Sequence, residues 1–201
     1  MINLAVFISG NGTNLVSILE RIDAGELNAK VVCVVSSNQR ACGIKFAESK
    51  HISVLAMNTD AYQNASLADE KILNFVKTHN ADYIIMAGYM RKVTDILLDA
   101  FPNKILNIHP ALLPSFKGAS AIKDAWNNGV KVTGVTVHFA NQDYDKGPII
   151  AQEAISISED DTFDTLESRI HELEHKIYPR VIQLLSENKI EIKDNKVIVK
   201  D

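Results

Sequence analysis

An amide, an imidazole and a carboxylate stand in the middle of this chain at positions where they could act together. Asn107 and His109 are separated by one residue, and Asp145 follows in a turn-like stretch. Lys104–His109 reads as a buried strand that ends because the next residue, a proline, cannot continue the ladder. Alternate side chains of a strand point to the same side of a sheet, so Asn107 and His109 share a face. The three groups predict a general acid with a hydrogen-bond donor beside it.

Each of these features also has a purely structural interpretation. The segment around Asp145 has the sequence DYDKGP, which is typical of a turn with no chemical role. A second histidine, His138, lies in an apolar run, and a lone histidine in such surroundings is usually a core residue. His109 departs from that rule because it stands at a strand end beside Asn107.

A glycine-rich turn, Ser9–Asn14, follows the first predicted strand and opens the first predicted helix. Free backbone N–H groups and the helix dipole make this position suitable for binding phosphate. Gly12, Thr13 and Asn14 are the candidate ligands, because the last two side chains can add donors. The turn lacks the GKS or GKT of a Walker A loop and the full GxGxxG pattern, so a plain tight turn stays an alternative.

The segment His171–His175, HELEH, matches the HExxH pattern of zinc proteases. No GxxH follows it, and the nearby downstream carboxylates, Glu187 and Glu191, come after Pro179, which disrupts helices. We therefore expect no bound metal.

Composition predicts one soluble globular domain. The chain has 201 residues, of which 46% are hydrophobic and 23% charged, with a net charge of −4. This charge argues against a general surface for nucleic acid, and no apolar run reaches the length of a membrane span. Cys33 and Cys42 have no disulfide-framework spacing, so we expect reduced, buried thiols in the cytoplasm.

The first two-thirds of the chain alternate short apolar runs with segments of helical periodicity, which indicates βα units around a parallel sheet. The predicted strands are 3–8, 30–36, 54–57, 83–88 and 104–109, and the predicted helices are 14–24, 41–50, 66–79 and 94–101. Gly25 is a candidate stop for the first helix.

The remainder predicts a mixed sheet edge. A helix at about 119–128 precedes two β-like runs, 131–139 and 149–157, and a long helix from about Thr162 should end or kink around Pro179. A terminal hairpin follows. The expected fold is a single α/β, Rossmann-like domain over residues 1–201, with a mostly parallel twisted sheet, an antiparallel edge and helices on both faces.

Several motifs in this order resemble the folate-dependent phosphoribosylglycinamide formyltransferase family. The motifs are ISGNGTNL, AGYMR, LNIHPALLP, GVTVHF, DKGPII and EHKIYP, and they extend over most of the chain. The resemblance implies a formyltransferase fold in which residues 1–109 form a nucleotide-binding-type half with the phosphate loop. Residues 110–201 would form a mixed half that completes a folate cleft.

The resemblance also implies site residues. The catalytic residues would be Asn107, His109 and Asp145. Substrate-binding residues would be Gly12, Thr13, Asn14 and Glu174, and the folate-lining residues would be Met90, Arg91, Val93 and Asn107. Three positions depart from the family pattern or vary within it: Ala65 replaces an arginine of many members, Ile122 replaces a histidine, and His171 stands where some members have a cationic or amide residue.

The implied reaction transfers a formyl group from 10-formyltetrahydrofolate to glycinamide ribonucleotide in purine biosynthesis, in the cytoplasm, by a monomer or homodimer without metal. A 10-formyltetrahydrofolate hydrolase is the main alternative, although similar hydrolases have an extra N-terminal regulatory domain. A methionyl-tRNA formyltransferase would need an additional C-terminal domain and a basic surface. A non-catalytic nucleotide-binding module would not need the Asn107, His109 and Asp145 combination.

Overall fold

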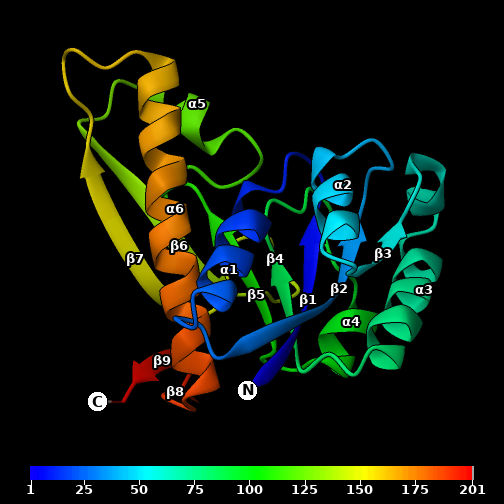
Figure 1. Cartoon of the computed structure of the whole chain (residues 1–201). Coiled ribbons are helices and arrows are strands. Elements are labelled where there is room, and N and C mark those ends of the chain that lie inside the picture. The colour runs from blue at the N-terminus through cyan, green and yellow to red at the C-terminus, as the bar shows by residue number, and fades with distance from the viewer. Residues whose placement is uncertain (201) are drawn as a thin grey trace. The chain divides into compact units, whose positions relative to one another are not determined.

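The computed structural model describes residues 1–200, and the chain forms two compact units, Met1–Asn107 and Ile108–Asp201. The first unit alternates strands and helices in βα units, as the sequence predicts (Figure 1). Its elements are β1 (Ile2–Ile8), α1 (Thr13–Asp23), β2 (Ala29–Ser36), α2 (Cys42–Ser49), β3 (Ser53–Ala56), a 3₁₀ helix (Thr59–Gln63), α3 (Ala65–Thr78), β4 (Tyr83–Met86), α4 (Asp95–Ala100) and β5 (Ile105–His109). The last strand, β5, begins in the first unit and ends in the second.

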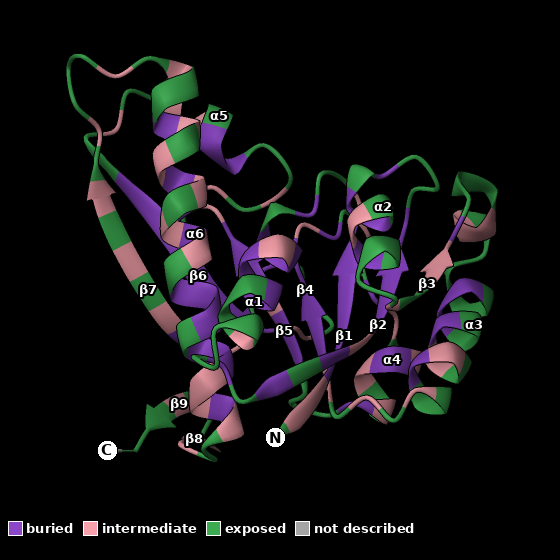
Figure 2. Cartoon of the chain, in the orientation of Figure 1, coloured by how far each residue is buried: buried purple, intermediate pink, exposed green. Residues whose placement is uncertain are grey.

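The strands of the first unit run in the order β3-β2-β1-β4-β5, and every neighbouring pair is parallel. Val6 of β1 pairs with Val34 of β2 on one side and with Ile85 of β4 on the other. Strands of a parallel sheet are covered on both faces and therefore read as continuous apolar runs. Figure 2 shows the result, with the middle strands buried along most of their length.

Strand order reverses between β3 and β4, because β4 returns to the other side of β1. With right-handed crossovers, this reversal places the helices before and after it on opposite faces of the sheet. The helix contacts agree, since α1 packs against α2 and α3 packs against α4. Ligands of such sheets bind at the carboxyl ends of the strands that flank the reversal, which are β1 and β4 here.

The second unit completes the sheet with an antiparallel edge. Its further elements are α5 (Ala121–Asn127), β6 (Val132–Phe139), β7 (Ile149–Ser156), α6 (Phe163–Ser186), β8 (Ile190–Lys193) and β9 (Lys196–Val199). The sheet order continues β5-β6-β7, and β6 pairs antiparallel with β7. The predicted mixed edge and the predicted terminal hairpin, β8-β9, are both confirmed.

Of the two outcomes predicted at Pro179, an end or a kink of helix α6, the end is wrong, because α6 continues to Ser186. Thr162 caps its start together with Thr165. A proline inside a helix removes one hydrogen bond, yet the turns after Pro179 bury Val181 and Ile182 completely. Burial of this apolar face keeps the segment helical.

Other differences from the sequence predictions are small. Most element ends lie within one or two residues of the predicted ones, and the 3₁₀ helix was not predicted. Gly25, with φ of 74°, follows the end of α1 as expected. Cys33 is buried, whereas Cys42 is exposed, so the expectation of two buried thiols is wrong for Cys42, which lies at the open first turn of α2. Within residues 1–200, no helix is both long enough and apolar enough to cross a membrane.

Candidate active site

The structure brings His109 and Asp145 together inside the second unit. His109 is the last residue of β5, and its Nδ1 lies 3.6 Å from Oδ2 of Asp145. The two side chains are 5% and 2% exposed, so water screens their interaction poorly. The Nε2 of His109 donates to the carbonyl of Phe116 at 2.8 Å, and the Gly118 N–H donates to Oδ2 of Asp145 at 2.9 Å. The ring and the carboxylate are therefore each fixed by a backbone group.

The loop that begins after His109 is bonded to β6 and β7 by a polar network that is buried at Thr136. Thr136 of β6 donates to the carbonyl of Ala111 at 2.6 Å and accepts from the N–H of Leu113 at 3.0 Å. Gln152 of β7 donates to Thr136 and to the Leu113 carbonyl. These bonds hold the start of the loop that carries the Phe116 and Gly118 backbone groups to the site.

Asp145 reaches the site through a tight turn after β6. Its φ is 52°, in the left-handed region that aspartate tolerates better than most residues. Gly147 is packed so closely that a Cβ there would lie 1.7 Å from the carbonyl oxygen of Phe139. Phe139 is also bonded to the turn, since its N–H donates to the Pro148 carbonyl at 2.9 Å. The DYDKGP segment is thus a turn, as one interpretation proposed, and the turn places Asp145 against His109.

A second imidazole faces the same carboxylate, and sequence reasoning gave it no role. The Nε2 of His138 lies 3.7 Å from Oδ1 of Asp145, and its Nδ1 donates to the carbonyl of Phe139 at 2.9 Å. His138 is 2% exposed and stands where the β6-β7 register shifts, an irregularity that can re-aim a side chain. The spacing of His138 and Asp145 follows no helix or strand period, so the sequence alone does not predict their contact. The contact depends on the register shift and on the turn.

The environment holds the Asp145 carboxyl in its charged form. Burial acts to raise its pKa, but the interactions with His138, with the Gly118 N–H and with His109 outweigh burial and keep the pKa below its usual value. The carboxylate is therefore ionised at neutral pH.

Asn107 is two residues before His109 on β5 and is half-buried. Strand alternation directs both side chains to one side of the sheet, as predicted. The pairing of Met86 with Asn107 fixes this part of β5 in the first unit.

The glycine-rich turn of the first unit has the backbone expected of a close-approach loop. Gly12 precedes α1 with φ of 75°, and Thr13 begins the helix. A Cβ on Gly12 would lie 2.9 Å from the Cα of Gly43, at the start of α2. The Gly43 N–H donates to the carbonyl of Gly10 at 3.2 Å. Because Gly12 and Gly43 have no side chains, the start of α2 can pack directly against the turn.

The segment Met90–Val93 follows β4, on the other side of the reversal. Ser9 links it to the glycine-rich turn, because the Ser9 hydroxyl accepts from the Met90 N–H at 2.8 Å. The guanidinium of Arg91 lies over the ring of Tyr62 at 4.7 Å, a cation–π contact. Met90 is 59% exposed while Val93 is buried. The contact of Ser9 with Met90 was not predicted, because a serine at a strand end gives no sequence signal for such a link.

Glu174 lies on α6 and is buried, and its carboxylate contacts the imidazole of His171 at 3.1 Å. The hydrogen bond to Glu174 raises the pKa of His171, although burial acts against it. The two downstream carboxylates of the HExxH interpretation pair with lysines, Glu187 with Lys189 and Glu191 with Lys200. Among residues 1–200, no group of three potential metal ligands is found.

The departures from the family pattern have plain structural settings. Ala65 is exposed at the start of α3, and Ile122 is 9% exposed and packs in the core from α5. The exposed Ala65 cannot supply the cation of an arginine.

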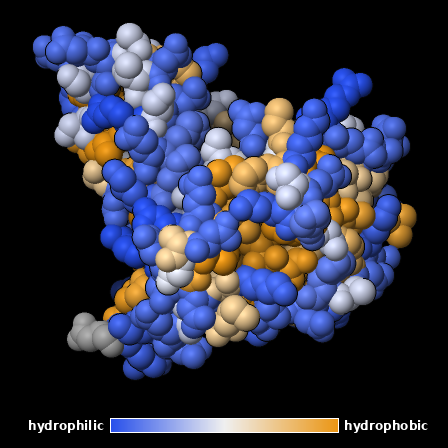
Figure 3. Space-filling view, in the orientation of Figure 1, coloured by the Kyte–Doolittle hydropathy of each residue, from blue (hydrophilic) through white to orange (hydrophobic). Residues whose placement is uncertain are grey.

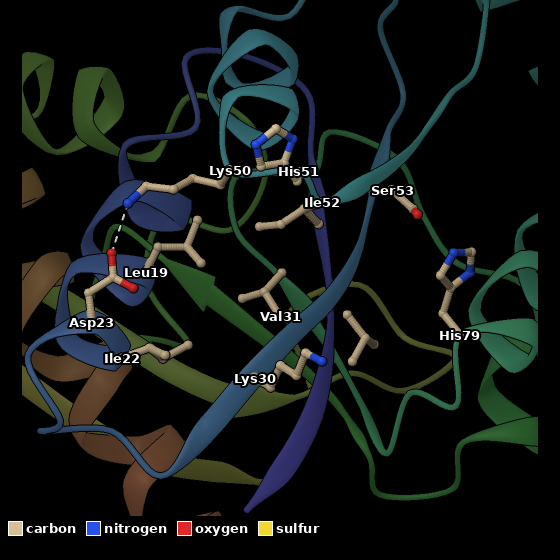
Figure 4. Close-up of a pocket in the computed structure, with 11 residues that line it drawn as sticks. Leu19, Ile22, Asp23, Lys30, Val31, Lys50, His51, Ile52, Ser53 and His79 are labelled. Carbon is tan, nitrogen blue, oxygen red and sulfur yellow. Dashed lines mark hydrogen bonds and ion pairs between the residues drawn. The ribbon is translucent and has the colours of Figure 1, made fainter.

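A pocket of about 450 Å³ opens in the first unit, but away from the candidate residues (Figure 4). Lys30 and Val31, at the start of β2, line it, whereas the glycine-rich turn follows the end of β1. Lys50 crosses its rim to Asp23 at 2.8 Å. Figure 3 shows apolar side chains gathered on this face of the first unit. Because the pocket lies at the amino ends of the strands, we do not assign the chemistry to it.

Known proteins similar to this chain include formyltransferases and a deformylase. Residues 2–182 match the model of the family described as formyl transferase. A phosphoribosylglycinamide formyltransferase of Bacillus subtilis (strain 168) is 45% identical over 185 residues, which are 92% of this chain and 95% of that protein.

Two solved structures have nearly the same fold. Glycinamide ribonucleotide transformylase 1 from Symbiobacterium toebii gives a TM-score of 0.96 at 41% identity, with 100% of this chain and 95% of that chain covered. A formyltetrahydrofolate deformylase from Pseudomonas syringae pv. tomato gives 0.92 at 27% identity, with 100% of this chain but 66% of that chain covered. The family match, the extent of the sequence identity and the shared fold agree that the chain belongs to the formyl transferase family.

Proposed function

We propose that this formyltransferase moves a formyl group from 10-formyltetrahydrofolate to the primary amine of glycinamide ribonucleotide, a step of purine biosynthesis. The observation that carries the proposal is the buried contact between His109 and Asp145, 3.6 Å apart at the end of β5. The names of the most similar relatives support the same substrates.

The reaction develops a negative charge on the formyl oxygen and transfers two protons. The amine nitrogen attacks the formyl carbon, and the electron pair of the C=O bond moves to oxygen. The bond from that carbon to the folate nitrogen then breaks, the folate nitrogen takes up one proton and the amine nitrogen loses one. A site for this reaction needs donors aimed at the developing oxyanion and a group that moves a proton.

The side chains at the end of β5 match those needs. The Asn107 amide is a donor for the oxyanion, and the imidazole of His109 is the general acid. Asp145, which is ionised, holds and orients that ring. We assign all three as catalytic residues. None of these roles uses a metal ion or a covalent bond to the enzyme.

Other predicted residues would bind the two substrates. Gly12, Thr13 and Asn14 would hold the phosphate of the ribonucleotide at the start of α1, and Glu174 would bind the same substrate. Met90, Arg91 and Val93 would line the folate site together with Asn107. In this proposal residues 1–109 supply the phosphate loop, and residues 110–201 complete the site. The enzyme would work in the cytoplasm as a monomer or homodimer.

The experiment that tests the proposal is spectroscopic measurement of folate deformylation with and without glycinamide ribonucleotide. We expect deformylation only when the ribonucleotide is present, with one formylated product formed for each folate consumed. Equal rates with and without the ribonucleotide would assign the hydrolase activity instead, because water would then be the acceptor.

A further inference from the structure

Each oxygen of the Asp145 carboxylate faces a different imidazole. Oδ2 lies 3.6 Å from Nδ1 of His109, and Oδ1 lies 3.7 Å from Nε2 of His138. The His138 and Asp145 side chains are both 2% exposed. The reaction as derived above needs only one of these rings, which leaves a second buried titratable group unexplained.

The backbone contacts identify one nitrogen of each ring that carries hydrogen in this structure. A carbonyl oxygen only accepts, so Nε2 of His109 carries a hydrogen where it meets the Phe116 carbonyl. By the same reasoning, Nδ1 of His138 carries a hydrogen where it meets the Phe139 carbonyl. The other nitrogen of each ring faces Asp145, Nδ1 in His109 and Nε2 in His138. A ring with no hydrogen on that nitrogen would turn a lone pair toward the carboxylate, which is unfavourable.

This arrangement has a consequence during a proton transfer. When His109 gives its proton to the substrate, Asp145 loses the cation on Oδ2. A buried carboxylate with no cationic partner is strongly destabilised, and it would move or take up a proton itself. His138, in its protonated form, still neutralises the carboxylate from Oδ1.

We propose that His138 is a positioning residue for the formyl transfer: its imidazolium keeps Asp145 ionised and in place while His109 releases and recovers its proton. This inference rests on the proposed function, because it needs His109 and Asp145 to act in the reaction.

Three neighbours of Asp145 cannot replace His138 in this role. The Gly118 N–H donates to Oδ2 but carries no net charge. Tyr144, the preceding residue, stays neutral, because burial and then the Asp145 charge raise the pKa of its phenol. Lys146 pairs with Asp143 instead, at 3.3 Å on an exposed part of the turn.

The test is the His138→Gln variant, which keeps a neutral donor but no charge. We expect kcat to fall by about tenfold or more with both KM values changed by less than about threefold, since in this proposal the ring acts through Asp145. The acid limb of the kcat–pH profile should move upward by about one pH unit, because loss of the cation raises the pKa of Asp145. Unchanged kcat with an unmoved acid limb in folded protein would overturn the proposal and leave His138 as a core residue.

His79→Gln is the matched control. The Nδ1 of His79 also meets a backbone carbonyl, that of Phe75 at 2.9 Å, but on the last turn of α3 in the first unit. This variant should keep the wild-type kcat and pH profile. If His138→Gln does not fold, NMR of the wild type decides: a cationic His138 ring at the pH of activity supports the proposal, and a neutral ring throughout that range overturns it.

Failure of this inference is distinguishable from failure of the proposed function. If Asp145→Asn is inactive while His138→Gln behaves like the wild type, only the role of His138 is wrong. If Asp145→Asn is fully active, the proposed catalytic trio is wrong and His138 has no carboxylate to support.

Discussion

At the scale of single residues, Asp145 offers the sharpest test of the proposed chemistry. Asparagine tolerates the left-handed conformation that Asp145 adopts, with φ of 52°, so Asp145→Asn should leave the turn intact. The substitution removes the carboxylate charge that faces the His109 ring. We expect kcat to fall by about 10² to 10⁴-fold, with both KM values changed much less. Steady-state kinetics with each substrate varied in turn would measure this split.

Asp143→Asn is the matched control, because Asp143 lies in the same turn and only forms an exposed ion pair with Lys146. This control should keep normal kcat. His109→Ala should cost about as much as Asp145→Asn, and the double variant little more than the worse single one, because groups that act as a unit are not additive. Near-normal kcat and an unshifted pH profile in Asp145→Asn would make Asp145 a turn residue only.

The contribution of His171 to the free energy of unfolding should depend on pH in the opposite direction to that of a carboxylate whose pKa is lowered. The bond to Glu174 raises the pKa of His171 above its value in the unfolded chain. The stabilisation is therefore fully present below the usual pKa of about 6.5 and is lost as the pH rises through the raised value. His171→Gln should reduce the free energy of unfolding at about pH 5 by less than about 1 kcal/mol, since the side chain is 43% exposed.

Urea denaturation at about pH 5 and about pH 9 would measure this difference. The gap between wild type and variant should shrink at the higher pH. A gap that stays the same at both would mean that the ring contributes by packing rather than by its charge.

At the scale of elements, Gly147 decides how the turn after β6 is built. An alanine Cβ would lie 1.7 Å from the Phe139 carbonyl oxygen, so the turn would have to move away from β6. We expect Gly147→Ala to destabilise the fold by about 1 to 3 kcal/mol, a typical cost of overpacking, and to lower kcat because Asp145 moves with the turn. Thermal unfolding and kinetics on the same sample would check both effects.

Gly10→Ala is a control for stability alone, because a Cβ at Gly10 meets no atom within 4 Å. It should unfold close to the wild type. A Gly147→Ala protein as stable as Gly10→Ala would show that the turn can yield without cost.

The glycine-rich turn makes a separate prediction about substrate binding. Gly12→Val places a side chain in a left-handed conformation and against the backbone of Gly43, at 2.9 Å for the Cβ. We expect the KM for glycinamide ribonucleotide to rise by at least about tenfold and the KM for the folate to change far less. If both values rise equally, the turn is structural and does not hold the phosphate.

The elements could largely be predicted from the sequence, because apolar periodicity records burial directly. Continuous apolar runs identified the parallel strands, and Gly25 correctly predicted the end of α1. Of the two outcomes predicted at Pro179, only the end of α6 is wrong, because burial of the following turns outweighs the local cost of a proline. The 3₁₀ helix Thr59–Gln63 is too short to carry a periodic pattern. Among the site residues, His109 and Asp145 were correctly paired, but the contacts of His138 and Ser9 depend on a strand irregularity and a loop crossing that have no sequence signature.

At the scale of the whole molecule, we predict that formyl transfer needs no metal ion. The proposed roles are all filled by Asn107, His109 and Asp145, and the HELEH segment pairs its first histidine with Glu174. Activity should be unchanged after dialysis against a strong chelator and after addition of zinc. Stoichiometric zinc in the purified protein, with activity lost on chelation and restored by zinc, would contradict this prediction.

Both histidines of the site are oriented by main-chain carbonyls, those of Phe116 and Phe139. Every amino acid at those two positions has the same carbonyl, so sequence drift there cannot delete either acceptor by exchanging a side chain. A mutation can change which ring nitrogen carries the hydrogen only by moving the backbone. The turn at Gly147 and the loop after His109 define the path of that backbone. Point mutations at Phe116 and Phe139 should therefore leave the ring hydrogens in place. Mutation of Gly147, or a change in the length of the loop after His109, should displace them.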